Sequence, residues 1–360
     1  SADGQFTVSK VDGAGGLISE LSVAEQLLYE IGDPRAYLLP DVICDFSQVK
    51  LQQQGKNRVH LHGAKGLPPT DQYKVSATYP DGFRCTASCL IAGIDAVAKA
   101  ERVSQAIINK TSELFSQRGW APYTDVNIEL LGSEATYGPH AQRQDCREVV
   151  VKLAVRHPSK QALVLFAREI AQAATGMAPG LTGIVGGRPT VYPLIRLFSF
   201  LIDKSACQLQ VDFLGERHAC ELPVAEPLNT SIELIDPPKP QGRADANVPL
   251  VKLAVARSGD KGNHSNIGVI AREPEYLPWI AEALTPEVIV DWMSHVLDPI
   301  HGRVERWYLP GSHSLNFLLE NALGGGGIAS LRIDPQGKAF AQQLLEIPIA
   351  VPQHIADQLN

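Results

Sequence analysis

Residues 83–117 read FRCTASCLIAGIDAVAKAERVSQAIINKTSELFSQ, and this stretch decides the fold. Its first part alternates like a strand over Phe83–Leu90, and its second part repeats apolar residues at helical spacing over Asp95–Gln117. Working outward, the expected order continues as strand, strand, helix and strand over Val126–Leu131, Glu148–Val155, Lys160–Ala174 and Leu194–Ile202. The order predicts a ferredoxin-like sandwich, in which two helices cover one face of an antiparallel sheet.

Shorter elements flank this core. The patterns predict a strand at Phe6–Val11, a helix over Val23–Ile31 with Ser22 as N-cap, strands around Val42 and over Val59–Leu61, and a hairpin over Lys74–Leu90 that turns at Pro80-Asp81-Gly82. A strand pair, Gln208–Leu214 and His218–Leu222, is expected to extend the sheet.

A proline-rich stretch, Pro223–Pro249, is typical of a linker. We therefore predict a middle α/β region with a ferredoxin-like core at 1–225, a linker at 226–247 and a second ferredoxin-like domain at 248–360. Its expected strands are Leu250–Ala256, Ile267–Ala271, Val304–Leu309 and Ile328–Ile333, and its expected helices are Tyr276–Leu284, Pro286–Leu297, Ser314–Leu323 and Lys338–Leu345. The predicted fold class is α/β (α+β), with two ferredoxin-like α/β sandwich units joined by a Pro-rich linker.

Composition and charge exclude several kinds of partner. The 360 residues carry a formal net charge of -7 without a basic window, so no nucleic-acid partner is expected. No apolar run approaches the ~20 residues of a membrane helix, and Ser1–Gly16 is polar, so we expect no membrane partner and a cytoplasmic location. The six cysteines are scattered through apolar segments, which indicates free thiols rather than a disulfide framework or a metal site at Cys85 and Cys89.

The most distinctive pattern is a polar, glycine-punctuated stretch between two apolar strands, Ala256–Gly268. Its glycines permit positive φ, and its cationic side chains offer hydrogen-bond donors. Its carboxylate and side-chain amides can hold those cations in place or bind a polar ligand. Candidate ligand-binding residues are Arg257, Ser258, Gly259, Gly262, Asn263 and Asn266, with Asp260 and Lys261 as candidate catalytic residues. A phosphate or carboxylate suits this group; the alternative is a tight turn in which Asp260 binds backbone amides and Lys261 is a solvated charge.

The order Arg-Ser-Gly-Asp-Lys-Gly, followed by Asn-Ile-Gly, resembles the signature of the small C-terminal domain of the acyclic terpene utilisation (AtuA-like) family. Similar matches run along nearly the whole chain, at residues 1–4, 25–30, 33–38, 40–42, 136–140, 178–183, 196–201 and 316–319. The resemblance implies a role in degrading citronellol- and geraniol-type acids as coenzyme A thioesters. Relatives usually carry a further α/β segment ahead of Ser1, so assembly with such a segment, or a homo-oligomer, is expected.

Other candidate residues are scattered through the middle region. Gly13–Gly16 follows a strand and precedes a helix, but Ile18 stands where a dinucleotide fingerprint needs glycine, so a plain turn or an anion nest of Lys10, Gly15 and Gly16 is favoured. His140 follows a strand end and is a candidate general base, although a capped turn explains it equally well. Arg188 lies in a long glycine-rich connection, Thr175–Pro189, that can close over a ligand, whereas Gly324–Gly327 is more simply a helix end.

His60 and His62 alternate on one strand and share a face, but no third ligand is identifiable and no metal site is assigned. Three hypotheses follow: an enzyme of the acyl-CoA lyase or hydratase type acting on a branched acyl thioester or acid, a non-catalytic assembly subunit, and a metal-dependent protein. No cofactor is expected beyond a coenzyme A thioester as substrate.

Overall fold

The computed structural model describes residues 3–143, 145–220 and 235–359. The chain forms two compact units that are not continuous in sequence. Unit 1 contains residues 1–76, 199–322 and 336–360, and unit 2 contains residues 77–198 and 323–335. Part of the predicted linker, residues 226–234, lies outside the described residues.

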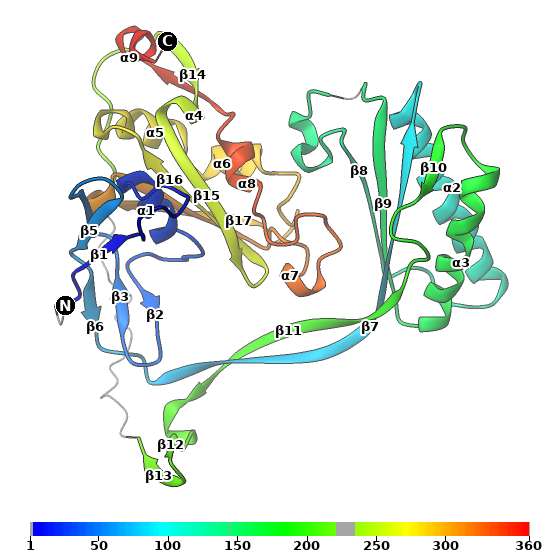
Figure 1. The fold of residues 1–360 in the computed structure, drawn as a ribbon, viewed down its shortest axis with the longest axis horizontal. Helices are drawn as coiled ribbons and strands as arrows, with labels where there is room; N and C mark the ends of the chain where they lie inside the picture. Colours follow the sequence, from blue (N-terminus) through cyan, green and yellow to red (C-terminus); the bar gives the residue numbers. More distant parts are fainter. Residues whose placement is uncertain (1–2, 144, 221–234, 360) are drawn as a thin grey trace. The chain divides into compact units, whose positions relative to one another are not determined.

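Unit 2 has the predicted strand and helix order. Strand β7 (Gln72–Ala92) leads through helix α2 (Ala96–Gln117) to β8 (Asp125–Leu131) and β9 (Glu148–His157), and then through α3 (Lys160–Gly176) to β10 (Leu181–Ile184) and β11 (Val191–Asp203). The antiparallel sheet has the order β10-β7-β9-β8, with β11 also paired to β7. Helices α2 and α3 lie on one side of this sheet (Figure 1), and Phe166, Ile107 and Val151 are fully buried between them. The ferredoxin-like prediction for this region is confirmed.

The other face of this sheet carries polar side chains and is partly covered by residues 323–335, which include the short helix α7 (Gly326–Ala329). Lys152 and Arg156 on β9 are 8% and 6% exposed and donate to the carbonyl oxygens of Leu331 and Ala329. Lys152 also pairs with Glu129, which accepts from the Ile333 amide at 2.8 Å. The predicted strand Ile328–Ile333 is therefore wrong, because side chains of unit 2, rather than a neighbouring strand, bind its backbone.

Unit 1 contains a four-stranded antiparallel sheet, with the order β15-β16-β18-β17. These strands are β15 (Ala254–Lys261), β16 (His264–Ala271), β17 (Arg303–Leu309) and β18 (Ser314–Glu320). Helices α5 (Leu277–Ala283), α6 (Pro286–Trp292) and α8 (Phe340–Leu344) contact it, while α1 (Glu20–Leu27) packs against β15 and β16. The other strands and α-helices of unit 1 are β1 (Phe6–Ser9), β2 (Tyr37–Leu38), β3 (Ile43–Asp45), β4 (Lys50–Gln53), β5 (Arg58–His62), β6 (Lys65–Leu67), β12 (Gln210–Phe213), β13 (Glu216–Ala219), β14 (Ala246–Pro249), α4 (Leu250–Leu253), β19 (Pro348–Val351) and α9 (Gln353–Gln358).

Several predicted elements are corrected. The predicted helix Ser314–Leu323 is wrong, because Ser314–Glu320 form strand β18, which pairs with β16 and β17 on its two sides. Residues 74–90 belong to the single strand β7, not a hairpin. Gly82 has φ +80°, and a Cβ at this position would lie 2.9 Å from the His157 carbonyl oxygen, so glycine allows the two strands to approach here. The N-cap of α1 is Ser19 rather than Ser22, which instead completes a capping box with it. The segment Leu250–Leu253 is a helical turn, and β12 and β13 form a separate two-stranded hairpin.

Candidate functional site

The polar stretch Ala256–Gly268 is mostly strand, which corrects its prediction as a loop. Strands β15 and β16 are paired up to Lys261 and His264, so that only Gly262 and Asn263 form the turn. Gly262 has φ +66°, the left-handed value that a two-residue hairpin turn needs at its first position. The glycine is therefore explained by turn geometry.

The buried amides of the two central strands hold a distant part of the chain. Asn266, which is 0% exposed, donates to the Leu28 oxygen at 2.6 Å and accepts from the Glu30 amide at 2.9 Å. Asn316 donates to the oxygens of Ile31 and Gly32 at 3.2 and 2.7 Å. Since buried polar groups need partners, these amides fix the backbone that follows α1 against the sheet.

Ser258 and Gly259 serve packing in the same hairpin. The Ser258 hydroxyl donates to the Gly337 oxygen at 2.6 Å and accepts from the Ala341 amide at 3.0 Å, which holds α8. A Cβ on Gly259 would lie 2.6 Å from Glu30 Cγ and 2.7 Å from Tyr29 Cε2. The small residue thus lets the backbone after α1 come close to β15.

A cluster of charged groups surrounds Tyr29. The Arg257 guanidinium lies 4.3 Å, and the Lys338 ammonium 4.5 Å, from the centre of its ring. Lys338 donates to Glu30 Oε1 at 2.7 Å, to the Tyr29 hydroxyl and, at 3.4 Å, to Asp260 Oδ1. We call Tyr29, Glu30, Arg257, Asp260 and Lys338 the Tyr29 cluster.

The carboxylate and ammonium in this cluster shift each other's pKa. Burial acts to raise the pKa of Glu30, but hydrogen bonds from Lys338 and Tyr29 outweigh it, so that the pKa is lowered. Burial acts to lower the pKa of Lys338, and its hydrogen bonds to Glu30 and Tyr29 raise it overall. Both groups are therefore charged over the whole neutral range.

The other predicted residues of unit 1 also have protein partners. The Lys261 ammonium lies 5.1 Å from the centre of the Tyr37 ring, and Asn263 donates to Asn321 Oδ1 at 3.1 Å. Lys10 donates to the carbonyl oxygens of Ala14 and Gly16 at 2.6 and 2.8 Å, and so braces the turn that contains Gly15. Gly16 has φ +88°, which explains its glycine by turn geometry.

The two predicted residues of unit 2 lie in different places. His140 ends a short 3-10 helix, Ala135–His140, whereas Arg188 lines a cavity beside β7. Asp260 and Lys261 belong to unit 1, so no single unit contains all three candidate catalytic residues. His60 contacts Thr7 and Gln5, and within the described residues no group of three or more His, Cys, Asp or Glu side chains is arranged to hold a metal ion.

Unit 1 contains a cavity of about 760 Å³ that the sequence did not predict. It lies beside the N-terminal half of α1, and its apolar wall includes Leu21, Leu51 and Ile270. No local motif marks it, because its lining comes from four separate segments, 19–24, 50–53, 270–274 and 310–313. We call it the α1 cavity.

Charged side chains also line the α1 cavity. Within the described residues, the Lys50 ammonium has no hydrogen-bond or ion-pair partner, and Arg272 uses only its Nε, which donates to the Val251 oxygen at 3.2 Å. Glu273 and His313 also line the cavity, and His313 has the left-handed φ of +50°. The cavity thus combines an apolar wall with available cations, the two carboxylates of Glu20 and Glu273, and an imidazole.

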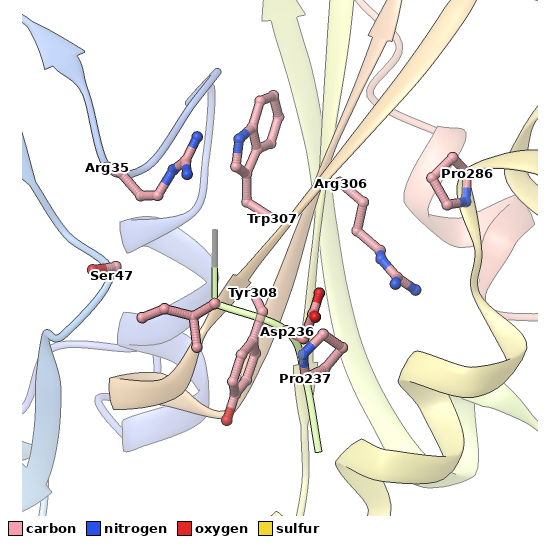
Figure 2. Close-up of a pocket in the computed structure, with 9 residues that line it drawn as sticks. Arg35, Ser47, Asp236, Pro237, Pro286, Arg306, Trp307 and Tyr308 are labelled. Carbon is pink, nitrogen blue, oxygen red and sulfur yellow. The ribbon is translucent and has the colours of Figure 1, made fainter. Parts of the chain in front are cut away.

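A second cavity of unit 1, of about 190 Å³, has charged groups that already have partners (Figure 2). Arg35 forms an ion pair with Asp33 at 2.6 Å, and Arg306 donates to the oxygens of Ala281 and Leu284 at 2.7 and 2.9 Å. Burial lowers the pKa of Arg306, while Asp236 and Glu287 act to raise it. Its size and its engaged guanidinium groups make it a poorer ligand site than the α1 cavity.

Family models identify the chain. The model described as acyclic terpene utilisation family protein AtuA matches residues 1–213, and the AtuA ferredoxin-like domain matches residues 248–350. The chain belongs to the acyclic terpene utilisation family. The resemblance inferred from the signature and the predicted ferredoxin-like fold class are both confirmed.

Solved structures offer only remote similarity. An amidase of the hydantoinase/carbamoylase family from Burkholderia multivorans is 14% identical, covers 36% of this chain and has a TM-score of 0.20. A putative amidohydrolase/peptidase from Burkholderia cenocepacia is 16% identical over 35% of the chain, also with a TM-score of 0.20. This chain covers 29% of each of those chains. No curated protein matches it.

The helices of the described residues are all too short or too polar to cross a bilayer.

Proposed function

We propose that this family member binds a branched acyl thioester, or the corresponding acid, of acyclic terpene breakdown in the α1 cavity. The observation that carries the proposal is the combination of an apolar wall with two available cations in one cavity of about 760 Å³. Ligand sites typically measure ~300–1,000 Å³ and pair an apolar lining with a few polar groups.

The two parts of the cavity suit the two parts of such a ligand. Leu21, Leu51 and Ile270 offer apolar surface to a branched hydrocarbon chain. Lys50 and Arg272 are placed to bind an anionic group, either the carboxylate of a free acid or a phosphate of coenzyme A. Burial of the hydrocarbon and charge-assisted hydrogen bonds then act on the same molecule.

The same cavity contains groups that can transfer a proton. Glu273 supplies a carboxylate and His313 an imidazole, and lyases and hydratases that act on thioesters need a group that removes a proton from water or substrate and one that returns a proton to carbon. His140, Asp260 and Lys261 remain alternative catalytic candidates from the sequence. The acyl-CoA lyase or hydratase reaction is therefore part of the proposal, with His313 as its first candidate base.

A binding experiment on the full chain tests the proposal. Coenzyme A, a branched acyl thioester, the free branched acid and a straight-chain acid of equal length are titrated while the melting temperature is followed, because a ligand that binds only the folded state raises it. Arg272→Gln is expected to weaken binding about tenfold or more, since it removes a charge-assisted contact. Lys56→Met, on the exposed turn between β4 and β5, is the matched control.

Stabilisation by the branched ligand that Arg272→Gln reduces and Lys56→Met preserves would support the α1 cavity. Equal affinity in wild type and Arg272→Gln would exclude it as the site. No stabilisation by any of the four ligands would contradict the acyl-binding function itself.

Exposed apolar side chains favour a second candidate, an assembly subunit. Phe198 and Leu201 on β11 are 57% and 62% exposed, and Leu214 in the β12–β13 hairpin is 90% exposed. Apolar surface of this kind commonly marks a protein interface. Sedimentation velocity tests this candidate: association that Phe198→Ser weakens supports it, and a monomer at every concentration contradicts it.

A further inference from the structure

Unit 2 contains a cavity of about 310 Å³ on the sheet face that α2 and α3 leave uncovered. Its floor is the side chains of Arg84, Thr86 and Ser88 on β7. The alternating residues Cys85, Ala87 and Cys89 are buried under the helices, so the alternation of the strand turns the three polar side chains to the opposite face.

The connection between β10 and β11 forms one wall of this cavity. The Val185 amide donates to the Ser88 oxygen at 2.8 Å and so fixes the start of the loop to β7. Gly186 and Gly187 both have φ +77°, and a Cβ on either would meet nothing within 4 Å. The glycines therefore bend the loop while leaving open space beside it.

Several side-chain donors that line this cavity have no hydrogen-bond acceptor in the described part of the chain. Arg188 has no hydrogen-bond or ion-pair partner there, and neither do the hydroxyls of Thr86, Ser88 and Thr190. Arg84 donates one Nη to the Ile328 oxygen at 3.1 Å, which leaves its other donors available. None of the described residues that line the cavity carries a carboxylate, and Arg156 lies opposite Arg84 in the strand register.

We propose that this cavity binds a phosphate ester, whose phosphoryl oxygens accept from Arg84, Arg188 and the neighbouring hydroxyls. Two guanidinium groups and three hydroxyls provide more donors than the two oxygens of a carboxylate can use, and they match a phosphoryl group or a diphosphate. The site belongs to unit 2 and does not depend on the acyl ligand of the α1 cavity.

The test is a calorimetric titration of the full chain with pyrophosphate, and separately with acetate, at constant ionic strength so that screening does not differ. Arg188→Gln is the main variant, because Arg188 has no hydrogen bond or ion pair to lose within the described residues. It is expected to weaken pyrophosphate binding about tenfold or more. Thr190→Val is expected to cause a smaller loss.

One control variant isolates the site. Arg102→Gln removes an exposed arginine from α2, outside the cavity, and is expected to keep wild-type pyrophosphate affinity. Saturable binding that is lost in Arg188→Gln alone supports the proposal. Absence of saturable binding, equal loss in Arg102→Gln, or acetate that binds as tightly as pyrophosphate would overturn it.

Discussion

Glu30 carries two unusual features at one residue. Its backbone has the left-handed φ of +59°, a conformation that costs about 1 kcal/mol outside glycine. Its amide is held by Asn266 and its carboxylate by Lys338, so buried and charged partners on both sides stabilise the conformation. The left-handed turn brings Tyr29 and Glu30 to the strand that bears the family signature.

The lowered pKa of Glu30 and the raised pKa of Lys338 predict a definite pH dependence. The Glu30 contribution to stability is complete above its ordinary pKa of 4.5 and is lost as pH falls through the lowered value. The Lys338 contribution is complete below its ordinary pKa of 10.5 and is lost as pH rises through the raised value. The pair is therefore fully effective at neutral pH.

Lys338→Met should lower the free energy of unfolding at neutral pH by less than about 1 kcal/mol, because the ion pair is partly exposed. It should also reduce the loss of stability on acidification, since Glu30 then has no ammonium partner. Urea denaturation at neutral pH and below pH 4.5 measures both effects. Lys65→Met, on exposed β6, serves as control, and an unchanged acid dependence in Lys338→Met would contradict the assignment.

The residues of the family signature were recognised from the sequence, but their contacts were not. Asn266, Ser258 and Gly259 were expected to serve a ligand, whereas the structure gives each a partner or close neighbour in a distant segment. Asn266 and Leu28, for example, are separated by 238 positions. Nothing in the local pattern distinguishes an amide that binds a ligand from one that binds remote backbone.

At the scale of elements, strong periodicity was a reliable guide. The strands and helices of unit 2 were found because α2 and α3 each have one apolar face. The sequence of β18, SLNFLLE, misled because a central strand buried on both faces loses alternation and resembles a helix. Pro80-Asp81-Gly82 has turn chemistry, but within β7 its Asp81 forms an ion pair with Arg196.

The two ferredoxin-like sheets differ in which strand takes the edge position. In unit 2 the strand β10 comes after both helices, whereas in unit 1 the strand at the equivalent position, β15, comes before the helices and joins β16 through a hairpin. The two sheets are otherwise alike in order. The element count was predictable, but this permutation depends on pairing that the sequence pattern does not reveal.

Close packing between α1 and β16 gives an element-scale prediction. A Cβ on Gly268 would lie 2.6 Å from Leu28 Cβ, an atom that cannot move without the backbone beyond α1. Gly268→Ala should therefore destabilise unit 1 by about 1–3 kcal/mol. Gly32→Ala is the control, since its Cβ would meet nothing within 4 Å; equal unfolding free energies for the two variants would show that α1 is not packed tightly on β16.

At the scale of the whole molecule, each sheet has its second face covered by a segment distant in sequence. In unit 1 the cover is α1 and the residues after it, and in unit 2 it is residues 323–335. Buried polar groups hold both covers: Asn266 and Asn316 in unit 1, and Lys152 and Arg156 in unit 2. The sequence patterns predict domains as continuous stretches and do not reveal that residues 323–335 belong to unit 2, because the contacts that place them there are long-range.

Separate cores predict separate unfolding transitions. Trp279, Trp292 and Trp307 belong to unit 1 and Trp120 to unit 2, so tryptophan fluorescence mainly reports unit 1. Lys152→Met leaves Glu129 without its cation and should destabilise unit 2 by about 3 kcal/mol. Hydrogen exchange should then change over 77–198, while the fluorescence transition stays in place; a shift of both together would indicate a single cooperative unit.

The position of residues 323–335, far after residues 77–198 in the chain, also determines when unit 2 is completed during synthesis. As the ribosome releases residues 77–198, Lys152 and Arg156 have no carbonyl partners, because those lie more than 170 positions further along the chain. Until residues 329–331 have been synthesised, the two cations have only the carboxylates of Glu129 and Asp125 and water as partners. The nascent sheet is thereby kept polar and soluble on that face, and a prematurely terminated chain cannot bury it.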